Sequence, residues 1–331
     1  SEMCIRDSTY TLNNASPAVQ GLGVGESLTD TFTFTASDGH GGTASAVVTM
    51  SINGSNQAPM VAAATAVILE DVISVSGDLP APTDPNIHDV LTFIAQNNAL
   101  GSYGTLTLDA AGHYTYTLNN ALPVVQGLGV GEKLTDTFTF RVSDGHGGTA
   151  TNTLTLTING TNDLPSVGAA TASIVEDAAT VSGVLPAPVD PDLHDVVSFI
   201  PQTAALGLYG TFTVDASGNY TYVQNTSLPA LQGLGAGESL TDSFTVTVSD
   251  NHGGSSSTVI TVSINGSNDA PVVSAATADI AEDAVGVSGA LPPAVDPDLH
   301  DVASFIPQTD SAGLYGTLTL DASGNYTYIL N

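Results

Sequence analysis

Basic residues are almost absent from this chain, which holds three Lys plus Arg against 33 Asp plus Glu and carries a formal net charge of −30. Nucleic-acid binders neutralise phosphates with clustered Lys and Arg, and docking on anionic lipid needs the same charges. The composition therefore excludes nucleic acid as a partner and argues against binding to an anionic membrane surface.

Long apolar runs are absent too. No run approaches the roughly 18 residues that a membrane helix needs, so we expect no direct membrane insertion. No signal peptide is recognisable, and we expect any export signal or anchor to lie in sequence beyond this chain.

Cysteine is nearly absent, because Cys4 is the only one and no disulfide can form within the chain. Cys4 lies in the opening stretch SEMCIRDS, which resembles nothing else in the sequence. We predict that residues 1–8 are foreign or unstructured and exclude them from the fold.

A shortage of basic residues beside an excess of acids could indicate disorder. Hydrophobic residues nevertheless make up 42% of the chain and recur in regular patterns, which favours a packed core. We expect instead that many of the acids face a cation.

An internal repeat of 106 residues runs through the chain without insertion or deletion. Pro59, Pro165 and Pro271 keep this spacing, and the tyrosines from Tyr10 to Tyr328 keep it as well. The ends are cut at nearly the same phase, so we expect a window on a longer array. The predicted domains are the C-terminal part of a repeat at 9–57, complete repeats at 58–163 and 164–269, and the N-terminal part of a repeat at 270–331.

Alternation of apolar and polar residues predicts β-structure throughout each repeat, as at Phe138, Phe140 and Val142. Gly and Pro turn signals separate the runs, and no segment has a helical period. About seven strands are predicted, near 61–69, 72–79, 89–96, 104–109, 113–118, 135–143 and 149–159. The expected fold is all-β, with tandem immunoglobulin-like β-sandwich domains arranged end to end, each large enough to bury its own core.

The acids gather at turns. Each complete repeat has a Glu-Asp pair after its first strand, a D-P-[ND]-x-H-D loop, a G-E-x-L-T-D turn and an S-D-[GN]-H-G-G loop, and each junction reads N-G-[ST]-N-[DQ]-x-P. In a seven-strand sandwich the first and third of these turns lie at the bottom of one domain and the other two at the top of the next. Strand order therefore predicts that they meet around the junction residues.

Such crowding needs a cation. Like charges about 4 Å apart repel by roughly 1 kcal/mol even at the dielectric constant of water. Calcium accepts 6–8 oxygen ligands in flexible geometry, whereas magnesium demands a tighter octahedron, so Ca2+ is the predicted cofactor. The candidate ligands are Asp84, Asp89 and Asp144; Glu70, Asp71, Asp136, Asn162, Asp163, Asp190, Asp192, Asp195 and Asp250; and Glu176, Asp177, Asp242, Asn268, Asp269, Asp296, Asp298 and Asp301. The alternative is that acids prefer turns and keep a surface hydrated.

The stretch S-D-G-H-G-G-T at 143–149, followed by L-T-L-T-I-N-G-T-N-D-L-P at 154–165, resembles the VCBS repeat of large bacterial surface proteins. It is similar, more distantly, to the end of a cadherin domain, and G-E-K-L-T-D-T-F-T-F at 131–140 fits the same pattern. The resemblance covers 9–331. It implies a cadherin-like fold, calcium at the linkers and membership in a giant RTX-type adhesin exported by type I secretion to the bacterial cell surface.

Matching positions imply ligands above the linker (Asp190, Asp192, Asp250), within it (Asn162, Asp163) and below it (Glu70, Asp136). Two departures concern the first junction, where Gln57 replaces the linker Asp and Asn86 replaces the second Asp of the D-P-D pattern. We therefore expect the first junction to bind calcium less tightly.

Nothing in the sequence predicts an enzyme, because there is no nucleophile elbow and active sites are seldom copied at every repeat. We expect a calcium-stiffened extender, or stalk, of a secreted or surface-attached adhesin that supports cell adhesion or biofilm formation, with neighbouring repeats as its partners through calcium linkers. The alternative is that individual repeats bind a glycan or matrix partner. Tyr-Thr-Tyr at 114–116 could bind a sugar, although paired tyrosines on one strand face more often belong to the core. The histidines of the loops could bind zinc, although polar residues are common in turns in any case.

Overall fold

The computed structural model describes residues 8–331, so the predicted foreign stretch lies outside the described residues except for Ser8. The chain divides into two compact units. Unit 1 runs to Asn162 and includes Asp192–His194, and unit 2 comprises Asp163–Pro191 and Asp195–Asn331. The predicted domain boundaries at 58, 164 and 270 remain predictions.

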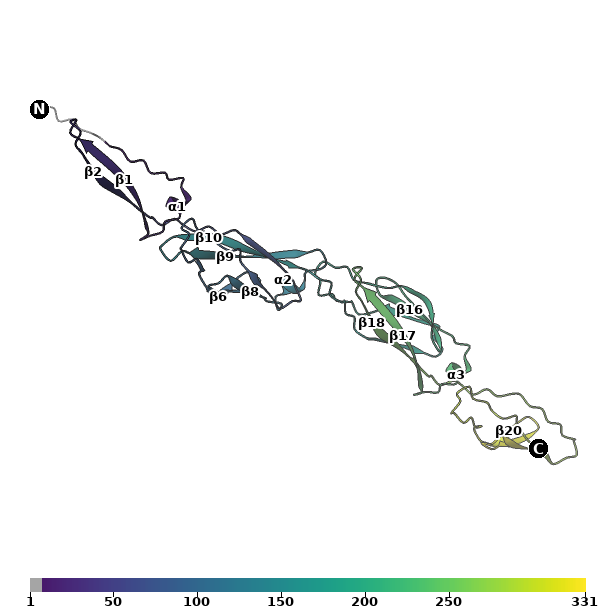
Figure 1. Cartoon of the computed structure of the whole chain (residues 1–331). Coiled ribbons are helices and arrows are strands. Elements are labelled where there is room, and N and C mark those ends of the chain that lie inside the picture. The colour runs from purple at the N-terminus through teal and green to yellow at the C-terminus, as the bar shows by residue number, and fades with distance from the viewer. Residues whose placement is uncertain (1–7) are drawn as a thin grey trace. The chain divides into compact units, whose positions relative to one another are not determined.

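Unit 1 begins with one helical turn and a long hairpin (Figure 1). The turn is α1 (Pro17–Gln20), and the hairpin pairs β1 (Ser27–Ser37) with β2 (Thr43–Asn53) over all 11 residues of each strand. The alternation of Phe and Val with Thr in these strands gives each of them one apolar face.

The rest of unit 1 is a sandwich of two four-stranded sheets. All neighbouring strands are antiparallel except β3 and β10, which run parallel. One sheet has the order β3 (Ala64–Leu69), β10 (Thr149–Asn159), β9 (Lys133–Ser143), β5 (Thr92–Phe93). The other has the order β4 (Ser74–Asp78), β8 (His113–Leu118), β7 (Gly104–Leu108), β6 (Gln96–Leu100), and α2 (Pro123–Gln126) precedes β9.

Unit 2 repeats this sandwich and then adds a single sheet. The sandwich consists of β11 (Ala170–Val175), β18 (Ser255–Asn265), β17 (Ser239–Ser249) and β13 (Ser198–Phe199), facing β12 (Thr180–Val184), β16 (Asn219–Gln224), β15 (Gly210–Val214) and β14 (Gln202–Leu206), with α3 at Pro229–Gln232. The single sheet has the order β19 (Gly286–Ala290), β22 (Asn325–Leu330), β21 (Gly316–Leu320), β20 (Gln308–Ala312).

Each sandwich has one apolar core formed by the inward residues of both sheets. Phe140 and Leu156 from one sheet and Leu106 and Tyr116 from the other are fully buried. The Tyr-Thr-Tyr pair is therefore core, as paired tyrosines on one strand face indicate. The all-β prediction is confirmed, with two sheets per complete repeat.

Two local features differ from the sequence prediction. The single strand expected at 89–96 is two short strands, β5 and β6, which belong to different sheets. The three helices were not expected; each has four residues, too few for a helical period, and begins with a proline at its first position, where the missing N–H costs nothing. None of the helices in residues 8–331 is long and apolar enough to cross a membrane.

Candidate metal centre

Three carboxylates of unit 1 come together beside the linker 54–59, which we call the first junction. Asp84, Asp89 and Asp144 each have a carboxylate oxygen within 4.8 Å of the other two. Asp84 and Asp89 lie in the loop between β4 and β5, and Asp144 directly follows β9. The structure thus brings together the two loops that strand order assigns to the top of a domain.

Several oxygens of this group lack donors. Asp84 Oδ2, Asp89 Oδ2 and Asn56 Oδ1 are buried and have no hydrogen-bond partner among the described residues. Buried acceptors of this kind are rare, because each costs the free energy of a lost hydrogen bond with water. A bound cation would satisfy all three.

Asp144 is held in its ionised form. Asn56 Nδ2 donates to Asp144 Oδ2 at 2.9 Å, and the amides of His146 and Gly148 donate to Oδ1. Burial opposes ionisation, but these bonds outweigh it and hold the pKa of Asp144 below its ordinary value. The group therefore offers a carboxylate rather than a carboxylic acid at neutral pH.

The turn of the preceding part repeat reaches the same loop. Glu26 lies in the G-E-S-L-T-D turn, and its Oε1 is 2.9 Å from Nδ1 of His88, while its Oε2 accepts a bond from the Gly23 amide at 2.8 Å. This is the contact that strand order predicts between the bottom of one repeat and the top of the next. The glutamate turns were noted in the sequence, but their pairing with histidine was missed.

The same pairing recurs at the other junctions. Glu132 Oε1 lies 2.9 Å from His194 Nδ1 within unit 1, and Glu238 Oε1 lies 2.7 Å from His300 Nδ1 within unit 2. The signal was present in the sequence, because the three Glu-His pairs keep one separation of 62 residues.

The side-chain amide of Asn86 forms hydrogen bonds to backbone groups at the first junction. Its Nδ2 donates to the carbonyl oxygens of Leu22 at 2.7 Å and Ser55 at 3.4 Å, and its Oδ1 accepts a bond from the Gln57 amide at 2.7 Å. The amide hydrogens thus satisfy carbonyl oxygens that a cation could otherwise coordinate. This arrangement supports the expectation of weaker calcium binding at the first junction.

A second group lies in unit 2 beside the linker 266–271, the third junction. Asp296, Asp298 and Asp301 have carboxylate oxygens within 4.8 Å of one another. Asp298 occupies the position of Asn86 and is 1% exposed. Its Oδ2 accepts a bond from the Asp269 amide at 3.0 Å, whereas its Oδ1 is buried with no partner among the described residues.

Glu176 contacts the linker of the third junction. Its side chain is completely buried. Oε1 accepts bonds from the amide and hydroxyl of Ser267 at 2.7 and 3.1 Å, whereas Oε2 is buried and has no partner in the part of the chain that the structure describes. A fully buried glutamate with one satisfied oxygen is a strong candidate for a cation ligand.

The acids of the third junction repel one another, which also favours a bound cation. Burial, together with the carboxylates of Asp177, Asp298 and Asp296, raises the pKa of Asp269 above its ordinary value. The acids before and after the linker therefore act on one another. Their mutual repulsion is uncompensated by any Lys or Arg, since all three basic residues lie before position 142 in the sequence.

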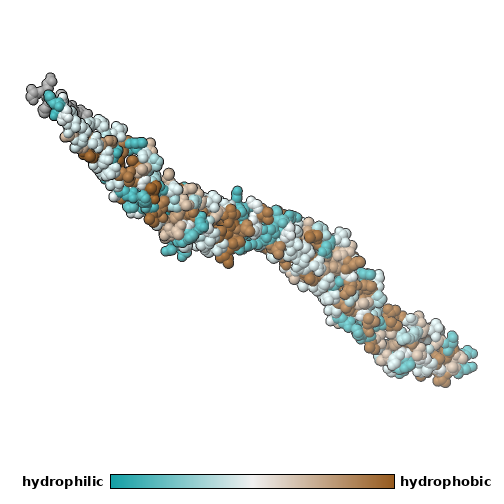
Figure 2. Space-filling view, in the orientation of Figure 1, coloured by the Kyte–Doolittle hydropathy of each residue, from teal (hydrophilic) through white to brown (hydrophobic). Residues whose placement is uncertain are grey.

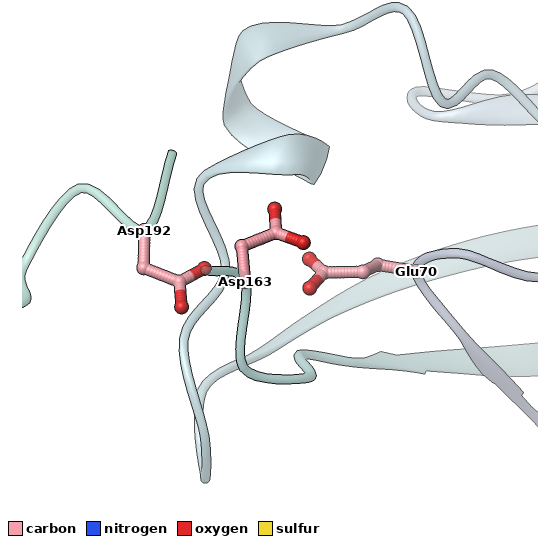
Figure 3. A group of neighbouring side chains, drawn as sticks. All are labelled: Glu70, Asp163 and Asp192. Atoms are coloured by element: carbon pink, nitrogen blue, oxygen red, sulfur yellow. The ribbon is translucent and has the colours of Figure 1, made fainter. Parts of the chain in front are cut away.

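At the linker 160–165, the second junction, the division between the units falls at Asn162 and Asp163. Within unit 1, Glu70 and Asp192 have carboxylate oxygens within 4.8 Å of each other, and Figure 3 shows both side chains. Glu70 is fully buried, and its Oε1 accepts bonds from the amide and hydroxyl of Thr161 at 2.9 and 3.0 Å. These contacts repeat those of Glu176 with Ser267.

Two predicted ligands lie apart from these groups. Asp136 is 2% exposed, and its carboxylate accepts bonds from the amides of Ser102 at 2.9 Å and Tyr103 at 3.0 Å and from the Tyr116 hydroxyl at 3.1 Å. Asp242 makes the same bonds in unit 2. Both stabilise a tight loop inside the sandwich, and neither belongs to an acid cluster that could hold a metal ion among residues 8–331, so we leave them out of the proposed site.

An apolar contact accompanies the acids at the third junction. The Leu299 amide donates to the Gly233 carbonyl at 3.1 Å, and a Cβ at position 233 would lie 2.5 Å from Leu299 Cγ. Within unit 1, Leu193 rests on Gly127 in the same way. The glycine after each helical turn therefore gives room to a leucine of the acidic loop.

Replacing Gly233 by alanine is expected to push Leu299 off α3 and to speed exchange of the Leu299 amide hydrogen roughly tenfold, as expected for overpacking. Gly233 has φ −100°, so the backbone itself accepts alanine. Gly168→Ala is the matched control, because its Cβ would meet only Pro186 at 3.9 Å. Unchanged exchange at Leu299 in Gly233→Ala would show that the contact contributes nothing.

Two stretches of the chain, 56–160 and 162–266, match the family model of the bacterial cadherin-like domain. A curated relative, the calcium-binding lectin RapA2 of Rhizobium johnstonii, is 26% identical over 185 residues, which is 51% of this chain and 74% of the relative. Among solved structures, the protocadherin GammaB4 extracellular domain is similar with a TM-score of 0.53 at 16% identity, over 92% of this chain and 49% of that one. The chain thus spans about half the length of that structure, and the likeness shows the fold alone.

The cadherin-like character implied by the sequence is confirmed by these matches. Cadherin-like domains are structural and binding domains, so the prediction that this chain is not an enzyme is confirmed by its relatives. Because the two matches together cover more than half of its residues, the chain belongs to the bacterial cadherin-like domain family.

Proposed function

We propose that the chain is a calcium-stiffened extender of a large extracellular bacterial adhesin, in which each linker between repeats binds Ca2+. One observation carries the proposal: at the third junction, Asp298 Oδ1 and Glu176 Oε2 are buried and receive no hydrogen bond from any described residue. Isolated buried carboxylates are too costly to persist without a counter-charge.

The residues at the third junction suit calcium. Carboxylate oxygens from separate loops match its flexible demand for 6–8 oxygen ligands, whereas magnesium requires near-ideal octahedral geometry. Burial and the repulsion of neighbouring carboxylates raise the pKa of Asp269, and bound calcium would offset that repulsion. The residues that would hold it at the third junction are Glu176, Asp177, Asn268, Asp269, Asp296, Asp298 and Asp301. Of the other predicted ligands, Glu70, Asp71, Asn162 and Asp192 belong to unit 1, and Asp163, Asp190, Asp195 and Asp250 belong to unit 2.

A stiff linker follows from shared ligands. A cation held by the Glu-Asp pair of one repeat and by the D-P-D-x-x-D loop of the next would fix the two repeats together, and its loss would let the like charges push them apart. The similarity to the calcium-binding lectin RapA2 supports the choice of ion. Type I secretion, an RTX-type parent and a role in biofilm formation are parts of the same proposal.

Calcium at a few millimolar is expected to raise the melting temperature of the chain by roughly 5–15 °C over EDTA, with magnesium giving little change. Extracellular modules bind calcium with Kd of about 10⁻⁴–10⁻³ M, so each occupied site adds roughly 1–2 kcal/mol, and about 1 kcal/mol shifts the melting temperature of a domain of this size by roughly 4–8 °C. Equal effects of the two ions, or none, would contradict the calcium sites. Electron micrographs of bent, collapsed chains at millimolar calcium would contradict the stalk.

Glycan binding by individual repeats is the second candidate, and one observation favours it. A cleft of about 460 Å³ in unit 2 is lined by Tyr209, Asn225 and Gln224 among others. Gln224 is 5% exposed, and its Oε1 has no partner among the described residues, although the other copies have leucine at this position. A glycan array with the full chain tests this; hits that vanish in Gln224→Leu would support a sugar site, and a blank array would exclude it.

A further inference from the structure

Asn86 and Asp298 occupy the same place in two copies of one junction. Both residues are 1% exposed. A Cβ added to Gly23 would lie 3.9 Å from Asn86 Cβ, and one added to the equivalent Gly235 would lie 3.7 Å from Asp298 Cβ. The surface of unit 1 mixes hydrophilic and hydrophobic residues (Figure 2), and Asn86 lies beneath that surface. The two junctions therefore compare one buried amide with one buried carboxylate.

One oxygen atom has the same role in both copies. Asn86 Oδ1 accepts a bond from the Gln57 amide at 2.7 Å, and Asp298 Oδ2 accepts one from the Asp269 amide at 3.0 Å. Gln57 and Asp269 are themselves equivalent, because two repeats of 106 residues separate them (269 − 57 = 212). The bond between the linker and the loop that follows it is thus present with either side chain.

The other terminal atom of the side chain decides the difference. Asn86 Nδ2 donates to the carbonyl oxygens of Leu22 at 2.7 Å and Ser55 at 3.4 Å. Asp298 Oδ1 is buried and receives no hydrogen bond from any described residue. A carboxylate only accepts hydrogen bonds, so it cannot bind carbonyl oxygens as the amide does. Asn86 is therefore satisfied within the protein, whereas Asp298 requires a positively charged partner.

Gln57 adds a second neutral bond at the first junction. Its Nε2 donates to the Gln20 carbonyl oxygen at 3.1 Å. Gln20 ends α1, which precedes the linker, and Asn86 bonds from the loop after the linker to Leu22, close to the same helical turn. The two amides thus connect the repeats on either side of the linker. Asp269, the equivalent of Gln57, has no side-chain amide with which to make such a bond.

We propose that Asn86 and Gln57 hold the first junction closed without calcium, so that it stays docked at calcium concentrations at which the third junction opens. The contrast with the third junction rests on the calcium-stiffened extender proposed above, whereas the amide bonds do not. The group Asp84, Asp89 and Asp144 can still take up an ion, but all three carboxylates lie after the linker. That ion is not needed to connect the two repeats.

A chain with both kinds of junction responds to calcium unevenly. Hydrogen bonds between neutral groups do not depend on an ion, whereas neighbouring carboxylates repel one another as soon as the ion leaves. As calcium falls, the third junction therefore loosens while the first keeps its geometry. The choice between amide and carboxylate at two positions, 57 and 86 in the first copy, sets this response.

Hydrogen exchange of single amides in the full chain tests the proposal. The amides of Gln57 and Ile87 are hydrogen-bonded at the first junction, and those of Asp269 and Leu299 are the equivalent reporters at the third. When EDTA replaces calcium, exchange should stay nearly constant at the first pair. At the second pair it should rise roughly tenfold, as expected when about one hydrogen bond is lost. Equal acceleration at both junctions would overturn the proposal.

Asn86→Asp tests the amide directly. In EDTA it should speed exchange of the Ile87 amide roughly tenfold, while native protection across β9 and β10 shows that the sandwich is folded. Asn97→Asp is the matched control, since it adds the same charge at an exposed position of β6 and should leave Ile87 unchanged. Unchanged exchange of Ile87 in Asn86→Asp, or equal acceleration in both variants, would contradict the role of the amide.

The reverse exchange separates this inference from the calcium sites. Asp269→Gln with Asp298→Asn copies the first junction and should slow exchange of the Leu299 amide in EDTA roughly tenfold relative to the native chain. No gain of protection there would count against the two amides. If calcium had no effect on the native third junction, the proposed calcium sites would fail. The result for Asn86→Asp in EDTA would still decide whether the amides close the first junction.

Discussion

Replacing Asp242 by alanine is expected to lower the unfolding free energy of the second sandwich by roughly 3–5 kcal/mol, because three hydrogen bonds to a charged acceptor are lost at once. The carboxylate accepts bonds from the amides of Leu208 and Tyr209, both at 3.0 Å, and from the Tyr222 hydroxyl at 3.2 Å. Alanine leaves these donors without their acceptor, and a donor that stays buried and unsatisfied costs about 1–3 kcal/mol. Hydrogen exchange in EDTA should show protection lost across β15–β17.

The untouched sandwich of unit 1 serves as the internal reference, because Asp136 makes the same bonds there. Asp136→Ala should destabilise the sandwich of unit 1 and leave the sandwich of unit 2 unchanged. Asp301→Ala is the matched control, since Asp301 is an exposed acid and its loss should leave stability in EDTA unchanged. If Asp242→Ala lowered the unfolding free energy only when calcium is present, Asp242 would have to be counted among the metal ligands.

Tyr222 gives the same loop a pH dependence of known sign. Burial and the neighbouring Asp242 raise the pKa of the tyrosine hydroxyl well above its ordinary value of 10.0. Stability from this bond is therefore complete below pH about 10 and declines above it.

Sequence alone predicts strands well here because the inner faces alternate strictly. Phe138, Phe140 and Val142 are all buried, and the strand that contains them was predicted within two residues at its start. The prediction failed at 89–96, where the chain crosses from one sheet to the other. Asn98 has φ 51° and the pairing shifts register between Gln96 and Ala99, and neither feature has a local pattern.

The acids show a different limit. Asp136 and Asp144 both lie near turns in the sequence, yet only Asp144 faces a junction. What separates them is a partner 35 residues away: a Cβ on Gly101 would lie 2.2 Å from Asp136 Oδ2, so the loop folds over that carboxylate only with glycine there. The glycines that recur at 101, 207 and 313 were a sequence signal for this loop. Their role can be recognised only from the tertiary packing of the loop over the carboxylate.

Replacing Asp298 by asparagine is expected to weaken calcium binding at the third junction at least tenfold. The variant copies the first junction, where Asn86 donates to the Leu22 and Ser55 carbonyls in place of a cation. Burial and the neighbouring acids raise the pKa of Asp269, and the variant removes one of those charges. A unit charge about 4 Å away contributes about 1 kcal/mol in water and more where water is excluded. Calcium titration of the full chain, followed by calorimetry, measures the change.

The effect of Asp298→Asn on stability should differ in sign between the calcium-free and the calcium-loaded chain. Without calcium, Asp298→Asn relieves repulsion and should leave the melting temperature unchanged or higher; with calcium, it should melt below the native chain. The reciprocal change, Asn86→Asp with Gln57→Asp, should strengthen calcium binding at the first junction and lower stability in EDTA. A variant that is merely misfolded would melt lower under both conditions. Parallel shifts of that kind would contradict a metal-binding role for Asp298, because only a ligand makes the sign of the effect depend on the ion.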